Sequence, residues 1–296
     1  MKRDATTLMD PRMSLQQSLL GLRNDWLGCE LLSGQEQAAD ALARRLVACD
    51  PYGENGHLKK AFARVGLDVD DSRLAQHLAH RIWCEARDAL WLQGVARPAL
   101  DLQVEHGHWY QETLGQPTLL VLPMTMALVD SLEVIRQALR GRRCVVYGEG
   151  LDTSLAADGI EVAGQGTRAV RRINEVLAEG GVLCTYADFS YASHAAVMAT
   201  VFGCPRPVSK GFLSLALRPG VRLLPVRLAV DSTRGRCTCE FSESLGFSVD
   251  ADLGASDRDA LHQQAADVVA QLLERSIAQA AWQWLLLPTL AFDTHQ

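Results

Sequence analysis

The residues best suited to chemistry follow the predicted core elements. Asp188 comes just after the apolar segment 182–186, which has the composition of a buried strand. Ligands of open α/β sheets gather at the carboxyl ends of strands, so Asp188 is a candidate pocket residue; the alternative is an Asx turn leading into Phe189. Ser209 and Lys210 open a predicted helix, where backbone N–H groups and the lysine could hold a phosphate. A plain N-cap is the alternative for Ser209.

Other reactive residue types are arranged less specifically. His106 and His108 alternate at the end of a predicted strand, and two imidazoles without a third ligand do not define a metal site. Arg168, Arg171 and Arg172 form either a basic patch for an acidic partner protein or an ordinary solvated helix face. The 8 cysteines include no CxxC pair and are scattered singly in apolar stretches. We therefore expect reduced thiols, no metal site and no cofactor.

The elements that position these residues follow from hydrophobic periodicity and turn residues. Apolar residues recur at helical spacing in 13–27, 35–47 and 71–92. The apolar run 118–124 indicates a central strand buried on both faces. The remaining predicted strands are 100–104, 143–147, 182–186, 223–230 and 237–241, and the predicted helices after the central strand are 127–139, 167–178 and 257–279.

Strands that alternate with helices imply an α/β fold, with a mostly parallel central sheet flanked by helices. We predict an α/β core at residues 98–296 and an N-terminal helical cap at residues 1–97. No linker sequence separates the two, so we expect one integrated domain.

Bulk composition excludes several classes of protein. The net charge of −6 argues against a nucleic-acid partner, whose binding surface would be basic. The sequence has neither a signal-peptide pattern nor an apolar run of the roughly 20 residues that a spanning helix needs. The helix predicted at 13–27 packs as part of the cap or rests on a membrane surface. We expect a cytoplasmic protein, at most peripheral to the inner membrane.

From Leu102 onward, a series of short segments resembles the LpxL/HtrB family, which transfers acyl chains to lipid A precursors. Each segment alone is weakly specific, and their order carries the resemblance. In that order, the segments are 116–122, 166–181, 186–188, 201–205, 209–217, 224–226 and 281–284. The resemblance implies a glycerolipid-acyltransferase-like fold and an acyl-CoA or acyl carrier protein (acyl-ACP) thioester as donor.

The catalytic motif of that family is changed in this chain. The family carries His-x-x-x-x-Glu, or Asp in its glycerolipid relatives, in which the His takes a proton from the acceptor and the carboxylate orients the His. The resemblance places Asp130 at the carboxylate and Thr125 at the His, whereas an ungapped alignment places Met124 at the His. Neither Thr nor Met is a general base at neutral pH. We also expect the family's N-terminal membrane anchor to be absent.

The resemblance implies the remaining site residues. We expect the Asp130 carboxylate to face the same crevice as Asp188 and its replacement by Asn to change stability little; a helix-dipole partner is the alternative. His194 is the best replacement base if catalysis persists, and a solvent-facing loop residue otherwise. The residues expected to line an apolar tunnel for the acyl chain are Met124, Met126 and Phe212.

Two functions remain open from the sequence. The first is an acyltransferase that passes an acyl group from acyl-CoA or acyl-ACP to a hydroxyl or an amine. The second is a non-catalytic module that binds an acyl chain or a carrier protein, which the missing His favours. The two differ in whether a base lies beside the acyl thioester.

Overall fold

The structure is a computed structural model that describes residues 36–51, 53–92, 94, 99–148, 159–163, 166–188, 196–231, 235–247 and 255–291. The helices first in chain order are α2 (Glu36–Cys49), α3 (Asn55–Arg64) and α4 (Asp71–Leu92). The predictions of helices at 35–47 and 71–92 are confirmed, whereas α3 was not predicted separately. The helix predicted at 13–27 lies outside the described residues.

Seven strands form one mixed sheet in the order β1-β9-β8-β2-β5-β3-β4. Five neighbouring strands, β8, β2, β5, β3 and β4, run parallel, while β9 is antiparallel to β8 and β1 is parallel to β9. The sheet is therefore mostly parallel, as predicted. Its strands are β1 (Asp101–Glu105), β2 (Thr118–Leu122), β3 (Cys144–Tyr147), β4 (Ile160–Ala163), β5 (Val182–Tyr186), β8 (Arg222–Asp231) and β9 (Arg236–Phe241).

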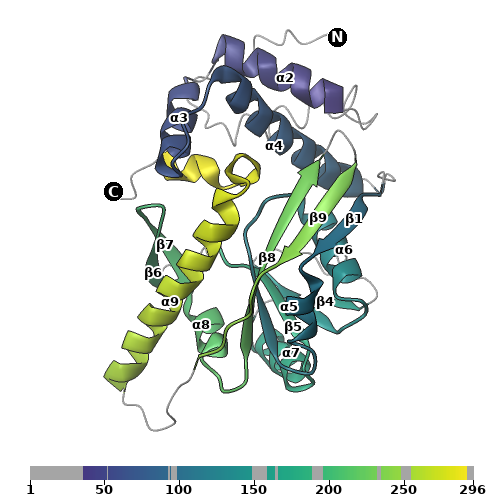
Figure 1. The fold of residues 1–296 in the computed structure, drawn as a ribbon, viewed down its shortest axis with the longest axis vertical. Coiled ribbons are helices and arrows are strands. Elements are labelled where there is room, and N and C mark those ends of the chain that lie inside the picture. Colours follow the sequence, from purple (N-terminus) through teal and green to yellow (C-terminus); the bar gives the residue numbers. More distant parts are fainter. Residues whose placement is uncertain are drawn as a thin grey trace.

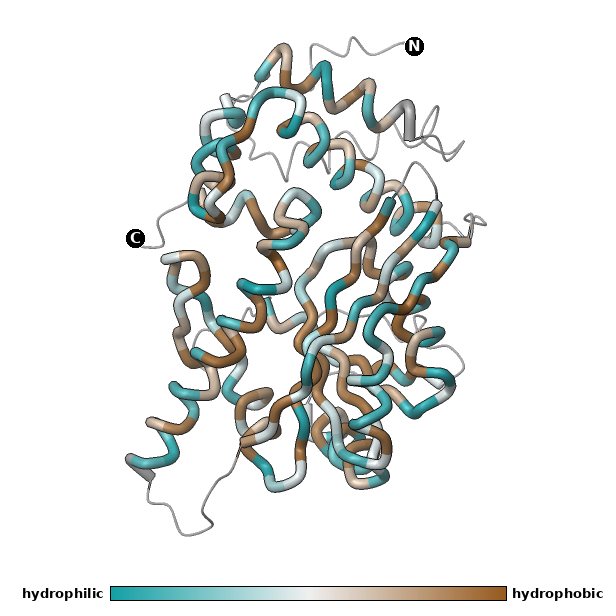
Figure 2. Tube along the Cα trace, viewed as in Figure 1, coloured by the Kyte–Doolittle hydropathy of each residue, from teal (hydrophilic) through white to brown (hydrophobic). Residues whose placement is uncertain are grey.

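Strand β2 lies between β8 and β5, and all of its residues are buried. Leu120 pairs with Leu224 on one side and with Cys184 on the other. A strand covered on both faces needs a continuous apolar run, and the sequence supplies one at this position. Figure 2 shows hydrophobic residues recurring along the inner strands of the sheet.

The remaining helices are α5 (Gly107–Gln111), α6 (Leu128–Ala138), α7 (Thr167–Ala178), α8 (Lys210–Ala216) and α9 (Ala255–Ala278), followed by the 3-10 turns η6 (Ala281–Gln283) and η7 (Leu287–Ala291). Helix α9 runs beside a separate hairpin of β6 (Ala196–Val201) and β7 (Cys204–Ser209) (Figure 1). Phe202 and Gly203 close the hairpin with φ of 49° and 72°, as a two-residue turn of this type requires.

Candidate functional site

Helix α4 crosses the carboxyl end of β2 and contacts the start of α6 through three polar side chains. His80, Arg87 and Asp88 each bond a group between Thr125 and Asp130. The segment that resembles the family's catalytic motif is therefore held by the helix that precedes the sheet in the sequence.

Asp130 lies in the first turn of α6 and forms a buried ion pair with Arg87. The Arg87 guanidinium binds both carboxylate oxygens, and its Nη2 lies 2.9 Å from Oδ1. The guanidinium also stacks over the ring of Trp83, 4.9 Å from the ring centre. Because both charges are compensated inside the protein, Asp130 has the environment of a structural residue that joins α4 to α6.

Thr125 is buried, and its hydroxyl donates a hydrogen bond of 2.6 Å to the carbonyl of Leu228 in β8. Its own carbonyl accepts a bond of 2.7 Å from His80 Nε2. Burial lowers the pKa of His80 to about 4, so this imidazole is neutral at pH 7 and acts as a donor. No base therefore stands next to Thr125 and Asp130 in the manner of the family motif, among the residues that the structure describes.

Asp188 connects the end of β2 to the C-terminal segment. Its Oδ2 accepts bonds from the Met124 N–H at 2.9 Å and from Trp284 Nε1 at 2.7 Å. Its Oδ1 is buried and has no partner within the described part of the chain. Burial raises the pKa of Asp188 to about 6, although these two bonds and nearby Arg206 oppose the shift. The prediction that the strands before Met124 and Asp188 open on the same edge of the sheet is confirmed.

A cavity of about 710 Å³ lies at this edge of the sheet, and we call it the chain cavity. Its size falls in the usual range for small-molecule sites. Most of its lining is apolar and comes from the end of β2, from β5, α7 and α8, and from the segment after Trp284. The main apolar side chains are Met124, Met126, Leu128, Ile173, Leu183, Val208, Phe212, Leu215, Leu285 and Leu286.

The predicted site residues divide between the chain cavity and its surroundings. Met124, Met126, Ser209 and Phe212 line it. Asp188 is not part of the lining, but it holds the lining residue Met124 and the neighbouring Trp284 by hydrogen bonds. Thr125 bonds Leu228 and Asp130 pairs with Arg87, so neither side chain faces the cavity. His194 lies outside the described residues.

Ser209 and Lys210 at the start of α8 have ordinary structural contacts. The Ser209 hydroxyl caps the helix by accepting the Phe212 N–H at 3.4 Å. The Lys210 ammonium pairs with Asp259 of α9 at 2.9 Å. The plain N-cap is therefore the alternative that the geometry favours for Ser209.

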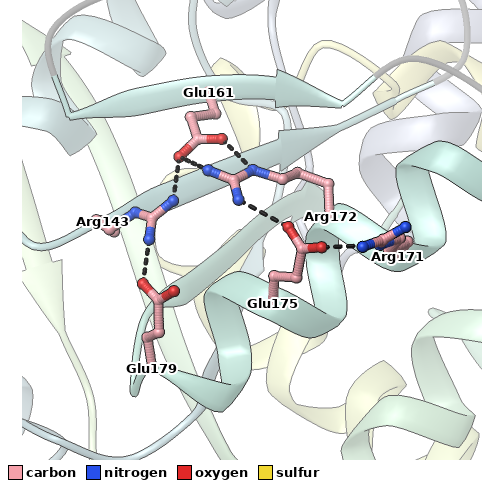
Figure 3. Close-up of polar contacts among 6 residues, drawn as sticks. All are labelled: Arg143, Glu161, Arg171, Arg172, Glu175 and Glu179. Atoms are coloured by element: carbon pink, nitrogen blue, oxygen red, sulfur yellow. Dashed lines mark hydrogen bonds and ion pairs between the residues drawn. The ribbon is translucent and has the colours of Figure 1, made fainter.

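Two of the three arginines of α7, Arg171 and Arg172, belong to a network that alternates in sign (Figure 3). Arg171 pairs with Glu175, and Arg172 pairs with Glu175 and with Glu161 of β4. Arg143 pairs with Glu161 and with Glu179. Since these three arginines face three glutamates, the network presents no excess of positive charge to an acidic partner.

Asp88 is the residue that reasoning from the sequence missed. Helix α6 begins after Ala127, which has no side chain to cap it. The carboxylate of Asp88 takes that place from α4, accepting the N–H groups of Leu128 and Val129 at 3.1 Å each. Asp88 also lines the chain cavity. The apolar start of α6 was the only signal in the sequence that a distant side chain must supply the cap.

Comparisons with known proteins identify no family for this chain. No family model matches the chain, and no curated protein matches it. The described helices include none with the length and apolar character needed to cross a bilayer. The fold and the site together define an α/β protein with a largely apolar cavity at the carboxyl edge of a mostly parallel sheet.

Proposed function

We propose that this protein binds an acyl chain, presented as an acyl-CoA or acyl-ACP thioester, in the chain cavity. The observation that carries the proposal is the cavity itself, with Met124, Met126 and Phe212 in its wall. Burying a methylene contributes about 0.8 kcal/mol, so an apolar cavity of this size favours a long chain over the unacylated carrier.

The LpxL/HtrB resemblance supports the same ligand class and a glycerolipid-acyltransferase-like fold with an N-terminal helical cap. The contacts of the two motif residues argue against transfer by Asp130 and Thr125, because Asp130 is paired with Arg87 and Thr125 bonds Leu228. Chain binding, which both functions left open by the sequence require, is therefore what the cavity supports. A cytoplasmic protein, at most peripheral to the inner membrane, remains our proposal for its location.

The test is calorimetric titration with CoA and with octanoyl-, dodecanoyl- and hexadecanoyl-CoA. We expect affinity to rise with chain length until the cavity is filled, and unacylated CoA to bind weakly. Leu215→Trp places an indole in the cavity wall and should weaken dodecanoyl-CoA binding at least about tenfold.

The matched control is Leu114→Trp, at a side chain that is 48% exposed and outside the cavity lining. It should leave affinity unchanged. Affinity that is independent of chain length, or that falls equally in both variants, would exclude the proposal.

A further inference from the structure

One face of α4 brings a row of charged side chains to the chain cavity. Arg81, Glu85 and Asp88 are spaced four and three residues apart, so they share a helix face, and all three line the cavity. We call them the α4 row. Their neighbour Arg87 is turned away from this face toward Asp130.

Arg81 is the residue of the α4 row whose N–H donors can bind a ligand. It makes no hydrogen bond within the described residues, although a guanidinium carries five N–H donors. Burial lowers its pKa, while Glu85 and Glu54 oppose this shift. A guanidinium keeps its charge in proteins. A partly buried guanidinium that faces a cavity can donate to an acceptor oxygen of a ligand there. Since Glu85 lies one turn away, a neutral carbonyl oxygen suits the position better than a second anion.

Asp88 is placed to exchange a proton. Each of its oxygens accepts one backbone N–H and keeps a further lone pair. Burial raises its pKa to about 6, with Asp130 and Glu85 adding to the shift and the two N–H bonds opposing it. At pH 7 the group is therefore ionised, yet it is basic enough to take a proton.

The other titratable groups at this end of the cavity are less suited to that task. Burial raises the pKa of the Cys84 thiol well above its usual range, so it stays protonated. The Tyr186 hydroxyl donates to Ser131, whose own proton goes to the carbonyl of Leu128. Burial likewise raises the pKa of Tyr186.

We propose that Asp88 is the general base, and Arg81 the carbonyl ligand, of an acyl-transfer site in the chain cavity. This inference rests on the proposed function, because the thioester is positioned by its bound chain. Asp88 takes the proton of a hydroxyl or amine acceptor as that atom attacks the thioester carbon. Arg81 binds the carbonyl oxygen as it gains negative charge. The C–S bond then breaks, the sulfur takes the proton from Asp88, and the products are the acylated acceptor and a free thiol.

The experiment measures thiol release from dodecanoyl-CoA with glycerol, whose hydroxyl groups do not titrate in this pH range, and binding of dodecanoyl-CoA by calorimetry. We expect turnover by the wild type, with a rate that rises with pH through about 6 and then levels. Asp88→Asn should lower the rate about 100-fold while affinity stays within about threefold. Arg81→Gln should also lower the rate but keep the pH dependence.

The matched control is Asp70→Asn. Asp70 is an exposed carboxylate that caps α4 by accepting the Arg73 N–H at 2.8 Å, away from the cavity. Asn can still accept a capping N–H, so both variants mainly lose the carboxylate charge, and the rate of Asp70→Asn should match the wild type. If Asp88→Asn fails to fold, the pH profile of the wild type decides, and a rate that does not change between pH 5 and 8 overturns the assignment.

The outcomes separate the two proposals. Binding without any thiol release, or full turnover by Asp88→Asn, overturns the catalytic assignment and leaves chain binding in place. Absence of binding to acyl-CoA of any length overturns both.

Discussion

Two carboxylates near the start of α6 have different environments although the sequence singles out only one. Asp130 follows a buried strand at the family spacing, but its charge is compensated by Arg87. Asp88 comes from a distant helix and is exposed to the chain cavity. Its position depends on how α4 packs on α6, which no local pattern encodes. The sequence could therefore predict Met124, Met126 and Phe212 as lining residues, whereas Asp88 and Arg81 required the structure.

Asp188 should make stability depend on pH. Its pKa is about 6 in the folded protein, against an ordinary value of 3.8, so the folded state holds its proton more tightly. Its contribution to stability is present at low pH and is lost as pH rises through 6. In the wild type the free energy of unfolding should decrease between pH 4.5 and 7. We expect this decrease to be smaller in Asp188→Asn, by about 2 kcal/mol. Chemical denaturation at the two pH values measures this change.

Asp88 adds a pH dependence of the same sign, so some slope remains in that variant. The control Asp71→Asn, at an exposed carboxylate paired with Lys59, should retain the wild-type slope. Equal slopes in Asp188→Asn and the wild type would show that the Asp188 pKa is not raised in the folded protein.

At the scale of elements, hydrophobic patterning predicted the buried inner strands of the sheet and missed β4, β6 and β7. Strand β7 carries Pro205 and Pro207, which argue against a strand. They pair with Thr200 and Met198 of β6, at positions where the residue's N–H points away from the partner strand. The hairpin therefore tolerates both prolines. Strand β4 has only four residues and lies at the sheet edge, so its pattern is too short to detect.

The ion pair between Arg87 and Asp130 ties α4 to α6, and its loss should be costly. Asp130→Asn removes one charge of this buried pair, and we expect the free energy of unfolding to fall by about 3 kcal/mol. This reverses the small effect expected from the sequence. Urea denaturation measures it. The exposed pair of Arg44 with Asp40 provides the control, since Asp40→Asn should cost less than about 1 kcal/mol. Similar costs for both variants would show that the buried pair has no structural role.

At the scale of the whole molecule, the chain cavity is built from segments far apart in the sequence. Arg81 and Asp88 come from α4, before the sheet, Met124 from the residues after β2, and Leu285 and Leu286 from the segment between η6 and η7. The C-terminal segment is fixed to β2 by the Leu285 N–H, which donates to the carbonyl of Met124 at 2.9 Å, and by Trp284 through Asp188. Patterning predicted the sheet, but a cavity that depends on these long-range contacts could be predicted only in part.

The central claim is that an acyl chain occupies this cavity. It is tested most directly by photo-crosslinking with an acyl-CoA that carries a diazirine near the end of its chain, followed by mapping of the labelled peptides by mass spectrometry. We expect labels on the cavity-lining residues of the β2–α6 connection, α7 and α8, and competition by unlabelled dodecanoyl-CoA. Labels confined to exposed apolar residues such as Met198 or Leu114, without competition, would contradict it.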